Sequence, residues 1–229
     1  MITKEERKLG EESVVYVKNH EVIGRLDALR LTDDLLRDSV REGIAHRLAC
    51  TKNDPDYLLG ILGSGKITRA LRDRLMRKPH DWKRETYLNQ PSTVRPDGKI
   101  AIVVAGGTED TGVEGGQPAT RSAKGQATRD AVDRNQMSFS AVDASFRRFD
   151  PPEPTDETWM LLYYIDEERG EVRAELSLPR FMDEDNYVTD WKERVILSAI
   201  PIDRPQVALS ANEEGDEGQY DADVQPRVG

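Results

Sequence analysis

The sequence predicts an α/β or α+β fold in which a helical N-terminal part packs with a mixed, mainly antiparallel sheet. Apolar residues recur every four positions from Leu36 to Leu48, which is the periodicity of a helix. The run KIAIVVA, Lys99 to Ala105, is typical of a buried strand. Two further apolar segments, residues 158–166 and 171–179, are separated by a short turn and predict a β-hairpin.

Changes in composition divide the chain of 229 residues into three parts. Residues 1–150 form a region of helices and strands that contains a basic helix and a glycine-rich loop. Residues 151–210 are rich in strands and are expected to belong to the same domain, although they begin with the linker-like Pro151-Pro152-Glu153-Pro154. Residues 211–229 are acidic and nearly free of large apolar side chains, so we expect a disordered acidic tail.

Charge and composition restrict the class of protein. The formal net charge of −10 favours solubility and argues against broad adsorption to DNA or to anionic membranes. No run of about 18 apolar residues is present, so no membrane partner is expected. Cys50 is the only cysteine, which excludes an internal disulfide and favours a reducing compartment. We therefore expect a soluble cytoplasmic protein.

Helix-start signals place the helices of the N-terminal part. Thr32 suits the N-cap of a helix that ends near Cys50, because its hydroxyl can accept a backbone N–H. Pro55 suits the first position of the next helix. Gly63-Ser64-Gly65 is expected to interrupt that helix, and a third helix should then run over residues 66–77.

The segment GILGSGKIT, Gly60 to Thr68, has the spacing of a phosphate-binding loop. Such a loop needs a hydroxyl directly after its lysine to reach Mg²⁺, and here that position is Ile67. Thr68 lies one residue later, about 100° further round a helix, and points elsewhere. The buried strand that should precede the loop is also missing. We therefore interpret the segment as helical and not as a nucleotide site.

The stretch KITRALRDRLMRKPHDWKR, residues 66–84, is a local excess of positive charge in an acidic protein. Its apolar residues can face the core while its cations face solvent. A helix, a glycine turn and a basic helix together resemble the layout of a helix-turn-helix DNA-binding motif. The cations expected to contact nucleic acid are Lys66, Arg69, Arg72, Arg77 and Lys78.

The function that these features favour is binding without catalysis. The chain would be a nucleic-acid-associated protein or a subunit of a larger complex, with DNA, RNA or other proteins as partners and no cofactor. Two simpler interpretations remain open. The basic face can be an ordinary solvated surface, or the acidic tail can neutralise it.

A metal-dependent enzyme is the alternative function. Glu109 and Asp110 follow the end of a predicted buried strand, where ligands of α/β sheets bind. Their carboxylates could hold Mg²⁺, and Lys124 could hold the phosphate of a substrate, with Arg121 and Arg129 nearby. In this hypothesis Glu109, Asp110 and Lys124 are the catalytic residues within the loop 106–125. A loop without function is the competing interpretation.

The predicted hairpin has a register that can be worked out from its turn. If residues 167–170 form the turn, Asp166 lies opposite Glu171 and Glu175 lies opposite Leu162. The carboxylates of Asp166 and Glu175 are then roughly 13 Å apart, too far to share a metal ion as in a nuclease. Leu176 should be fully buried, while the face that carries Glu175 should be wetter or functional.

The interpretation of Gly60 to Thr68 gives a first prediction. The chain should not bind ATP or GTP in the presence of Mg²⁺, because the hydroxyl position is occupied by Ile67. Isothermal titration calorimetry measures this directly. Micromolar binding that disappears in Lys66→Ala would show that the segment is a nucleotide site after all.

Overall fold

A computed structural model describes residues 12–137 and 156–202 of the chain. The predicted acidic tail and the linker Pro151-Pro152-Glu153-Pro154 lie outside the described residues. Among the helices that the structure describes, none is both long enough and apolar enough to cross a bilayer.

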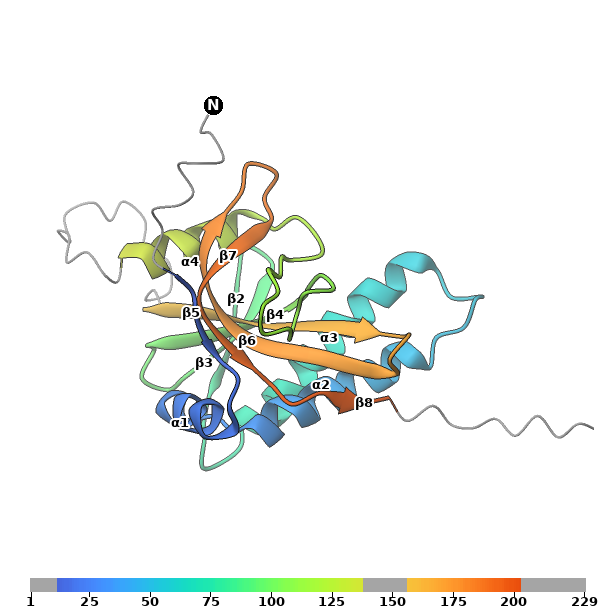
Figure 1. Ribbon diagram of the computed structural model, residues 1–229, viewed down its shortest axis with the longest axis horizontal. Helices are drawn as coiled ribbons and strands as arrows, with labels where there is room; N and C mark the ends of the chain where they lie inside the picture. The colour runs from blue at the N-terminus through green and yellow to red at the C-terminus, as the bar shows by residue number, and fades with distance from the viewer. Residues whose placement is uncertain (1–11, 138–155, 203–229) are drawn as a thin grey trace, which may run out of the picture.

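A single mixed sheet organises the molecule (Figure 1). Within the described residues its strand order is β1-β7-β6-β5-β4-β3-β2, and the short strand β8 also pairs with β6. The pairs β1–β7 and β4–β5 are parallel, and the other pairs are antiparallel. The strands are β1 (Val14–Tyr16), β2 (Lys83–Tyr87), β3 (Gln90–Val94), β4 (Ile100–Gly106), β5 (Glu157–Asp166), β6 (Glu171–Met182), β7 (Val188–Ile196) and β8 (Ile200–Pro201). The predicted fold class is therefore confirmed.

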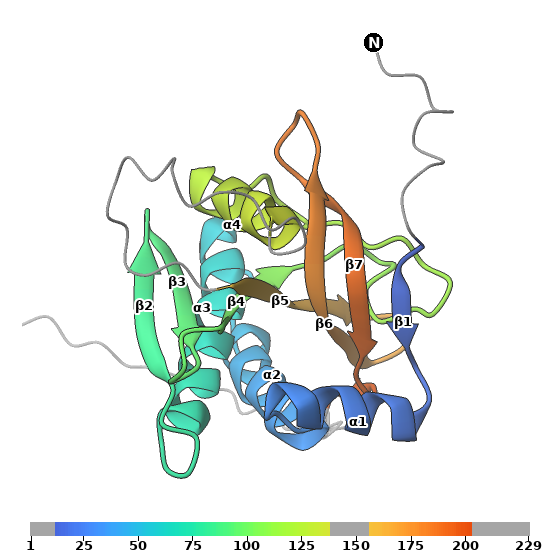
Figure 2. The same cartoon turned by 90° about the vertical axis from the view of Figure 1, so that its left-hand side faces the viewer.

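Helices cover both faces of this sheet, as Figure 2 shows. Helices α1 (Asn19–Leu29), α2 (Asp33–Leu48) and α3 (Asp56–Leu75) pack on one face. Helix α4 (Gln126–Met137) packs on the other, next to the loop that follows β4. The buried Asn135 ties α4 to the sheet, because its amide donates to the carbonyls of Thr158 and Pro179 at 3.0 and 3.1 Å.

Alternating residues of β5 fill the two cores. Trp159 and Leu161 pack in the larger core with α1, α2 and α3, whereas Met160 and Leu162 pack in the smaller core with α4. All four are fully buried, as expected for a strand covered on both faces. The predicted hairpin register is also confirmed, with Asp166 opposite Glu171 and Glu175 opposite Leu162.

The predicted break at Gly63-Ser64-Gly65 is wrong, because α3 is one continuous helix of 20 residues. A Cβ atom built at Gly63 would lie 2.3 Å from the Tyr163 hydroxyl oxygen, so the glycine lets β5 approach the helix. The Ser64 hydroxyl lies 3.2 Å from the same tyrosine oxygen. Packing against the sheet therefore offsets the low helix propensity of the glycines. The start of α2 is as predicted, since the Thr32 hydroxyl accepts the backbone N–H of Leu35.

Helix α1 and the hairpin β2–β3 were not predicted. Helix α1 has no side-chain N-cap, and Arg25 fixes it to β7 through two hydrogen bonds to the Glu193 carboxylate. The β2–β3 turn places Leu88 and Asn89 at φ of 44° and 64°, a conformation that usually selects asparagine and glycine. A leucine at such a position conceals the turn from sequence-based prediction.

The face of β6 that carries Glu175 is polar but buried, which corrects the expectation of a wetter face. The relative exposure of Glu175 is 0% and that of Arg194 on β7 is 3%. Arg194 donates to both carboxylate oxygens of Glu175, at 2.6 and 3.1 Å. The carboxylate also accepts the Ser177 hydroxyl at 2.7 Å and the Gly112 backbone N–H at 2.8 Å. The loop after β4 thus covers this face of the sheet.

The contact between α2 and α3 gives a testable pair of glycine substitutions. A Cβ atom at Gly43 would lie 2.4 Å from the backbone nitrogen of Ile67, so Gly43→Ala must push the two helices apart. We expect it to lower the free energy of unfolding by about 2 kcal/mol or more. Gly65→Ala is the matched control, because its Cβ meets nothing within 4 Å. It should stabilise α3 by about 0.5–1 kcal/mol in urea melts, and a destabilising Gly65→Ala would contradict a continuous helix.

Two neighbouring residues of β6, Glu175 and Leu176, provide a second pair of test substitutions. Leu176 is fully buried, as predicted, and Leu176→Ala should cost about 2–5 kcal/mol of unfolding free energy. Glu175→Ala should cost about 3–5 kcal/mol, because it leaves the buried Arg194 charge without its carboxylate. Denaturant melts measure both losses, and hydrogen exchange at the Gly112 amide should accelerate only in Glu175→Ala. A cost below about 1 kcal/mol for Glu175→Ala would mean that the pair does not hold the loop.

Candidate functional site

The cations predicted to contact nucleic acid lie along α3 and directly after it. Ile67, Leu71 and Leu75 are fully buried, whereas Arg69 and Asp73 between them are exposed on the outer side of the helix. Lys66 is half-buried, and Arg69, Arg77 and Lys78 are exposed. Because α3 continues without a turn before Lys66, the predicted helix-turn-helix layout is wrong.

Arg72 does not point into solvent like its neighbours. One of its terminal nitrogens donates to the carbonyl oxygens of Glu85 and Ser92, at 3.1 and 2.8 Å. These carbonyls belong to β2 and β3, so Arg72 clamps the hairpin to α3. Burial lowers the pKa of the Arg72 guanidinium, and the positive charge of Arg84 lowers this pKa further.

Most of the surrounding cations have no acidic partner. Arg69 pairs with Asp73 at 3.6 Å and Arg74 pairs with Glu42 at 2.8 Å. The other exposed cations here form no ion pair with any residue in the described part of the chain. We define the basic surface as Arg69, Arg72, Arg77, Lys78, Lys83 and Arg84. Figure 2 shows that the end of α3 and the β2–β3 hairpin lie together at one edge of the molecule.

A β-bridge and side-chain hydrogen bonds hold the backbone of the loop 107–125 in one conformation. Gly107 and Thr120 form a β-bridge across it. Arg194 donates to the carbonyls of Gly116 and Val113, at 2.7 and 3.0 Å. These bonds place the loop beside the carboxyl ends of the parallel strands β4 and β5, the position at which α/β sheets bind ligands.

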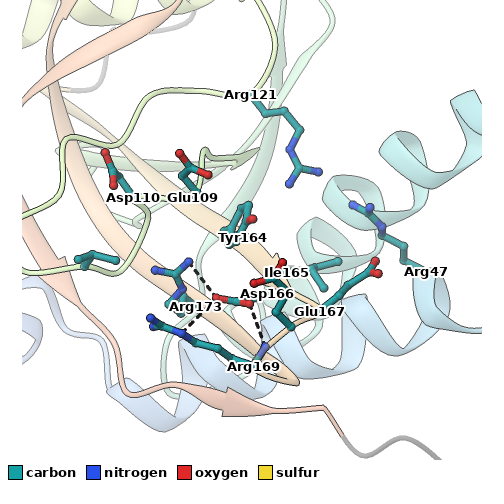
Figure 3. Close-up of a pocket in the computed structure, with 12 residues that line it drawn as sticks. Arg47, Glu109, Asp110, Arg121, Tyr164, Ile165, Asp166, Glu167, Arg169 and Arg173 are labelled. Carbon is teal, nitrogen blue, oxygen red and sulfur yellow. Dashed lines mark hydrogen bonds and ion pairs between the residues drawn. The ribbon is translucent and has the colours of Figure 1, made fainter.

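A depression of about 730 Å³ opens at this position (Figure 3). Tyr164 of β5 and Arg173 of β6 line it, and Arg173 pairs with Asp166 at 3.2 Å. The remaining walls come from the loop after β4, the end of α2 and the β5–β6 turn. The other lining residues are Arg47, Glu109, Asp110, Val113, Arg121, Ile165, Glu167, Glu168 and Arg169.

The residues of the enzyme hypothesis do not all meet here. Glu109 and Asp110 line the depression, and Asp110 also accepts the backbone N–H of Gln117 at 3.1 Å. Lys124 instead lies at the β6–β7 turn, where its backbone N–H donates to the Asn186 carbonyl at 2.8 Å. Burial lowers the pKa of the Lys124 ammonium. Arg129 contacts the side chain of the same asparagine.

Residues 12–137 and 156–202 contain no group of three His, Cys, Asp or Glu side chains placed to hold a metal ion. Glu109 and Asp110 therefore lie in the depression without a third acidic ligand in a metal-binding arrangement. Of the cations considered with them, only Arg121 lines the depression.

Sequence reasoning missed several residues of these sites. Arg47 reaches the depression from the last turn of α2, 60 residues before the first residue of the loop, Gly107. Tyr164 stands on β5, where the sequence indicated only core packing, and Arg173 stands on β6, on the face that was expected to be wetter or functional but was not given a site residue. The alternation of apolar and polar residues along β6 does mark Arg173 as facing away from the larger core. No signal in the sequence identifies Arg47.

Comparison of the chain with protein-family models, with curated proteins and with solved structures found no match. What the protein binds therefore has to be inferred from the contacts of its own residues.

Proposed function

We propose that the chain is a nucleic-acid-binding protein whose basic surface contacts the phosphate backbone. The surface combines the end of α3 with the outer strand of the β2–β3 hairpin. Its exposed cations are Arg69, Arg77, Lys78, Lys83 and Arg84. Lysine and arginine side chains are the groups that neutralise phosphates in complexes of this kind.

The observation that carries this proposal is the environment of Arg72. Its guanidinium donates hydrogen bonds to two backbone carbonyls and to no carboxylate among the described residues. Burial lowers its pKa, and a second arginine, Arg84, is close enough to lower this pKa further. Of the basic surface only Arg69 has an acidic partner in the part of the chain that the structure describes, and like charges that gather in this way create a local positive potential, even in a protein whose net charge is −10. A polyanion relieves this repulsion when it binds.

The geometry favours backbone contact over base recognition. In the described residues α3 runs unbroken through Gly63-Ser64-Gly65, so its basic half does not follow a glycine turn as the recognition helix of a helix-turn-helix motif does. The cations also come from three local structures: the helix, the segment after it and an edge strand. Such a surface suits contacts with phosphates, which give affinity and position but little sequence preference.

Salt dependence of binding tests the proposal. Labelled single-stranded and duplex oligonucleotides should bind at low ionic strength, with a slope of log K against log[salt] of about −3 to −4 if four cations meet phosphates. The triple variant Arg77→Gln, Lys78→Gln, Arg84→Gln should make the slope about 2 to 3 units shallower, as measured by fluorescence anisotropy.

A matched control variant distinguishes the effect of this surface from the effect of the protein's total charge. The triple variant Lys18→Gln, Arg41→Gln, Lys52→Gln removes the same charge from exposed positions elsewhere. It should leave the slope nearly unchanged. Equal weakening by the two triple variants, or no binding of either oligonucleotide at about 50 mM salt, would refute the proposal.

A further inference from the structure

The depression at the carboxyl ends of β4 and β5 carries a charge arrangement that folding alone does not require. Four arginines line it, and two of them are neutralised within it. The Asp166 carboxylate lies 3.2 Å from Arg173 and 3.8 Å from Arg169. Arg47 and Arg121 remain, and neither forms an ion pair within the described residues.

These two arginines face each other. In the view of Figure 3 the guanidinium groups of Arg121 and Arg47, which both line the depression, extend toward one another. Arg121 comes from the loop after β4 and Arg47 from the last turn of α2. Facing charges of the same sign repel each other, by an amount that grows as water is excluded from the space between them. An anion placed between them would turn this repulsion into two attractions.

The surrounding structure holds Arg121 in place. The Arg121 backbone N–H donates to the Gly106 carbonyl at the end of β4, at 2.8 Å. Its guanidinium carbon lies 5.7 Å from the centre of the Tyr164 ring, within range of a cation–π contact. The Arg173 guanidinium carbon lies 5.0 Å from the same ring and is held by Asp166. Arg121 is therefore already held in position. A bound anion would immobilise it at a smaller cost in conformational entropy.

The opposite side of the depression is acidic. In Figure 3 Glu109 and Asp110 lie on the far side of Tyr164 from Arg47. The β5–β6 turn adds the carboxylates of Glu167 and Glu168 to the lining, so a ligand between the two arginines would also have hydrogen-bond acceptors around it. The volume of about 730 Å³ falls in the range of small-molecule sites.

We propose that this depression binds a phosphate-bearing small molecule, with the phosphate held between Arg121 and Arg47 and hydrogen-bond donors of the ligand facing Glu109 and Asp110. Guanidinium groups suit this task because their planar donors match phosphate oxygens in pairs. The site is independent of the proposed nucleic-acid surface. Arg47 is at the C-terminal end of α2, whereas the basic surface starts at the C-terminal half of α3, and these two helices pack with Gly43 against Ile67.

The test is an NMR titration of the isotope-labelled full-length chain with pyrophosphate in a buffer that contains a metal chelator. We expect saturable shifts of the side-chain N–H signals of Arg121 and Arg47 and of the backbone amides at the end of β5. Arg121→Gln and Arg47→Gln should each weaken binding at least about tenfold, the loss expected for one charge-assisted hydrogen bond. Both side chains are on the surface, so each variant should keep the dispersed spectrum of the folded chain.

The control variant is Arg41→Gln, which removes an arginine from the same helix where it pairs with Asp38. It should leave pyrophosphate affinity within about twofold, because its guanidinium already has a carboxylate partner.

Absence of saturable shifts, an equal loss in Arg41→Gln, or shifts confined to Arg77 and Arg84 would each overturn the site. Binding of succinate in place of pyrophosphate would overturn the assignment to phosphate and indicate a carboxylate ligand. Loss of oligonucleotide binding in the basic-surface variant has no bearing on these outcomes.

Discussion

The buried pair of Glu175 and Arg194 is the constraint on which the second face of the sheet depends. Removing two charges from water costs several kcal/mol per ion, and good hydrogen bonding must offset that cost. The structure supplies it: the carboxylate accepts bonds from Arg194, Ser177 and the Gly112 backbone, and the guanidinium also donates to two loop carbonyls. One ion pair thereby joins β6, β7 and the loop 107–125.

This pair also links the fold to the candidate site. Without it, the loop after β4 would lose the side chains that hold Gly112, Val113 and Gly116. The same loop carries Glu109 and Asp110 to one side of the depression and Arg121 to another. A polar interaction inside the sheet therefore determines where the surface charges stand, although none of its own atoms is exposed enough to bind a ligand.

Periodicity predicted the parts of the fold that depend on local burial. The helix at Leu36 to Ile44, the buried strand β4 and the β5–β6 hairpin with its register all follow from repeating apolar positions. Prediction failed where a distant contact decides the outcome. Gly63 stays helical because Tyr163 packs on it, and the β2–β3 turn places Leu88 at positive φ. Glu175 is buried because Arg194 pairs with it, and the spacing of these two residues in the sequence does not indicate their contact.

The same distinction between local sequence patterns and distant contacts applies to the candidate sites. The sequence identified the excess of cations after Lys66 and the acids at the end of β4, because both are contiguous. It could not tell which cations are available for a partner, since that depends on what else packs against them. Arg72 sits among exposed cations yet is used to hold the β2–β3 hairpin, and Arg47 on another helix faces Arg121 across the depression.

Arg72 shows how a structural role can support the proposed binding role. A guanidinium bonded to carbonyls keeps its full charge, whereas one paired with a carboxylate contributes little to the field outside the protein. Arg72 binds the carbonyls of the β2–β3 hairpin, and this contact holds Lys83 and Arg84 of β2 near the end of α3. The guanidinium of Arg72 adds its own positive charge close to Arg84. The hairpin thereby extends a row of cations along one helix into a basic surface with two sides, which is the surface that we propose contacts a phosphate backbone.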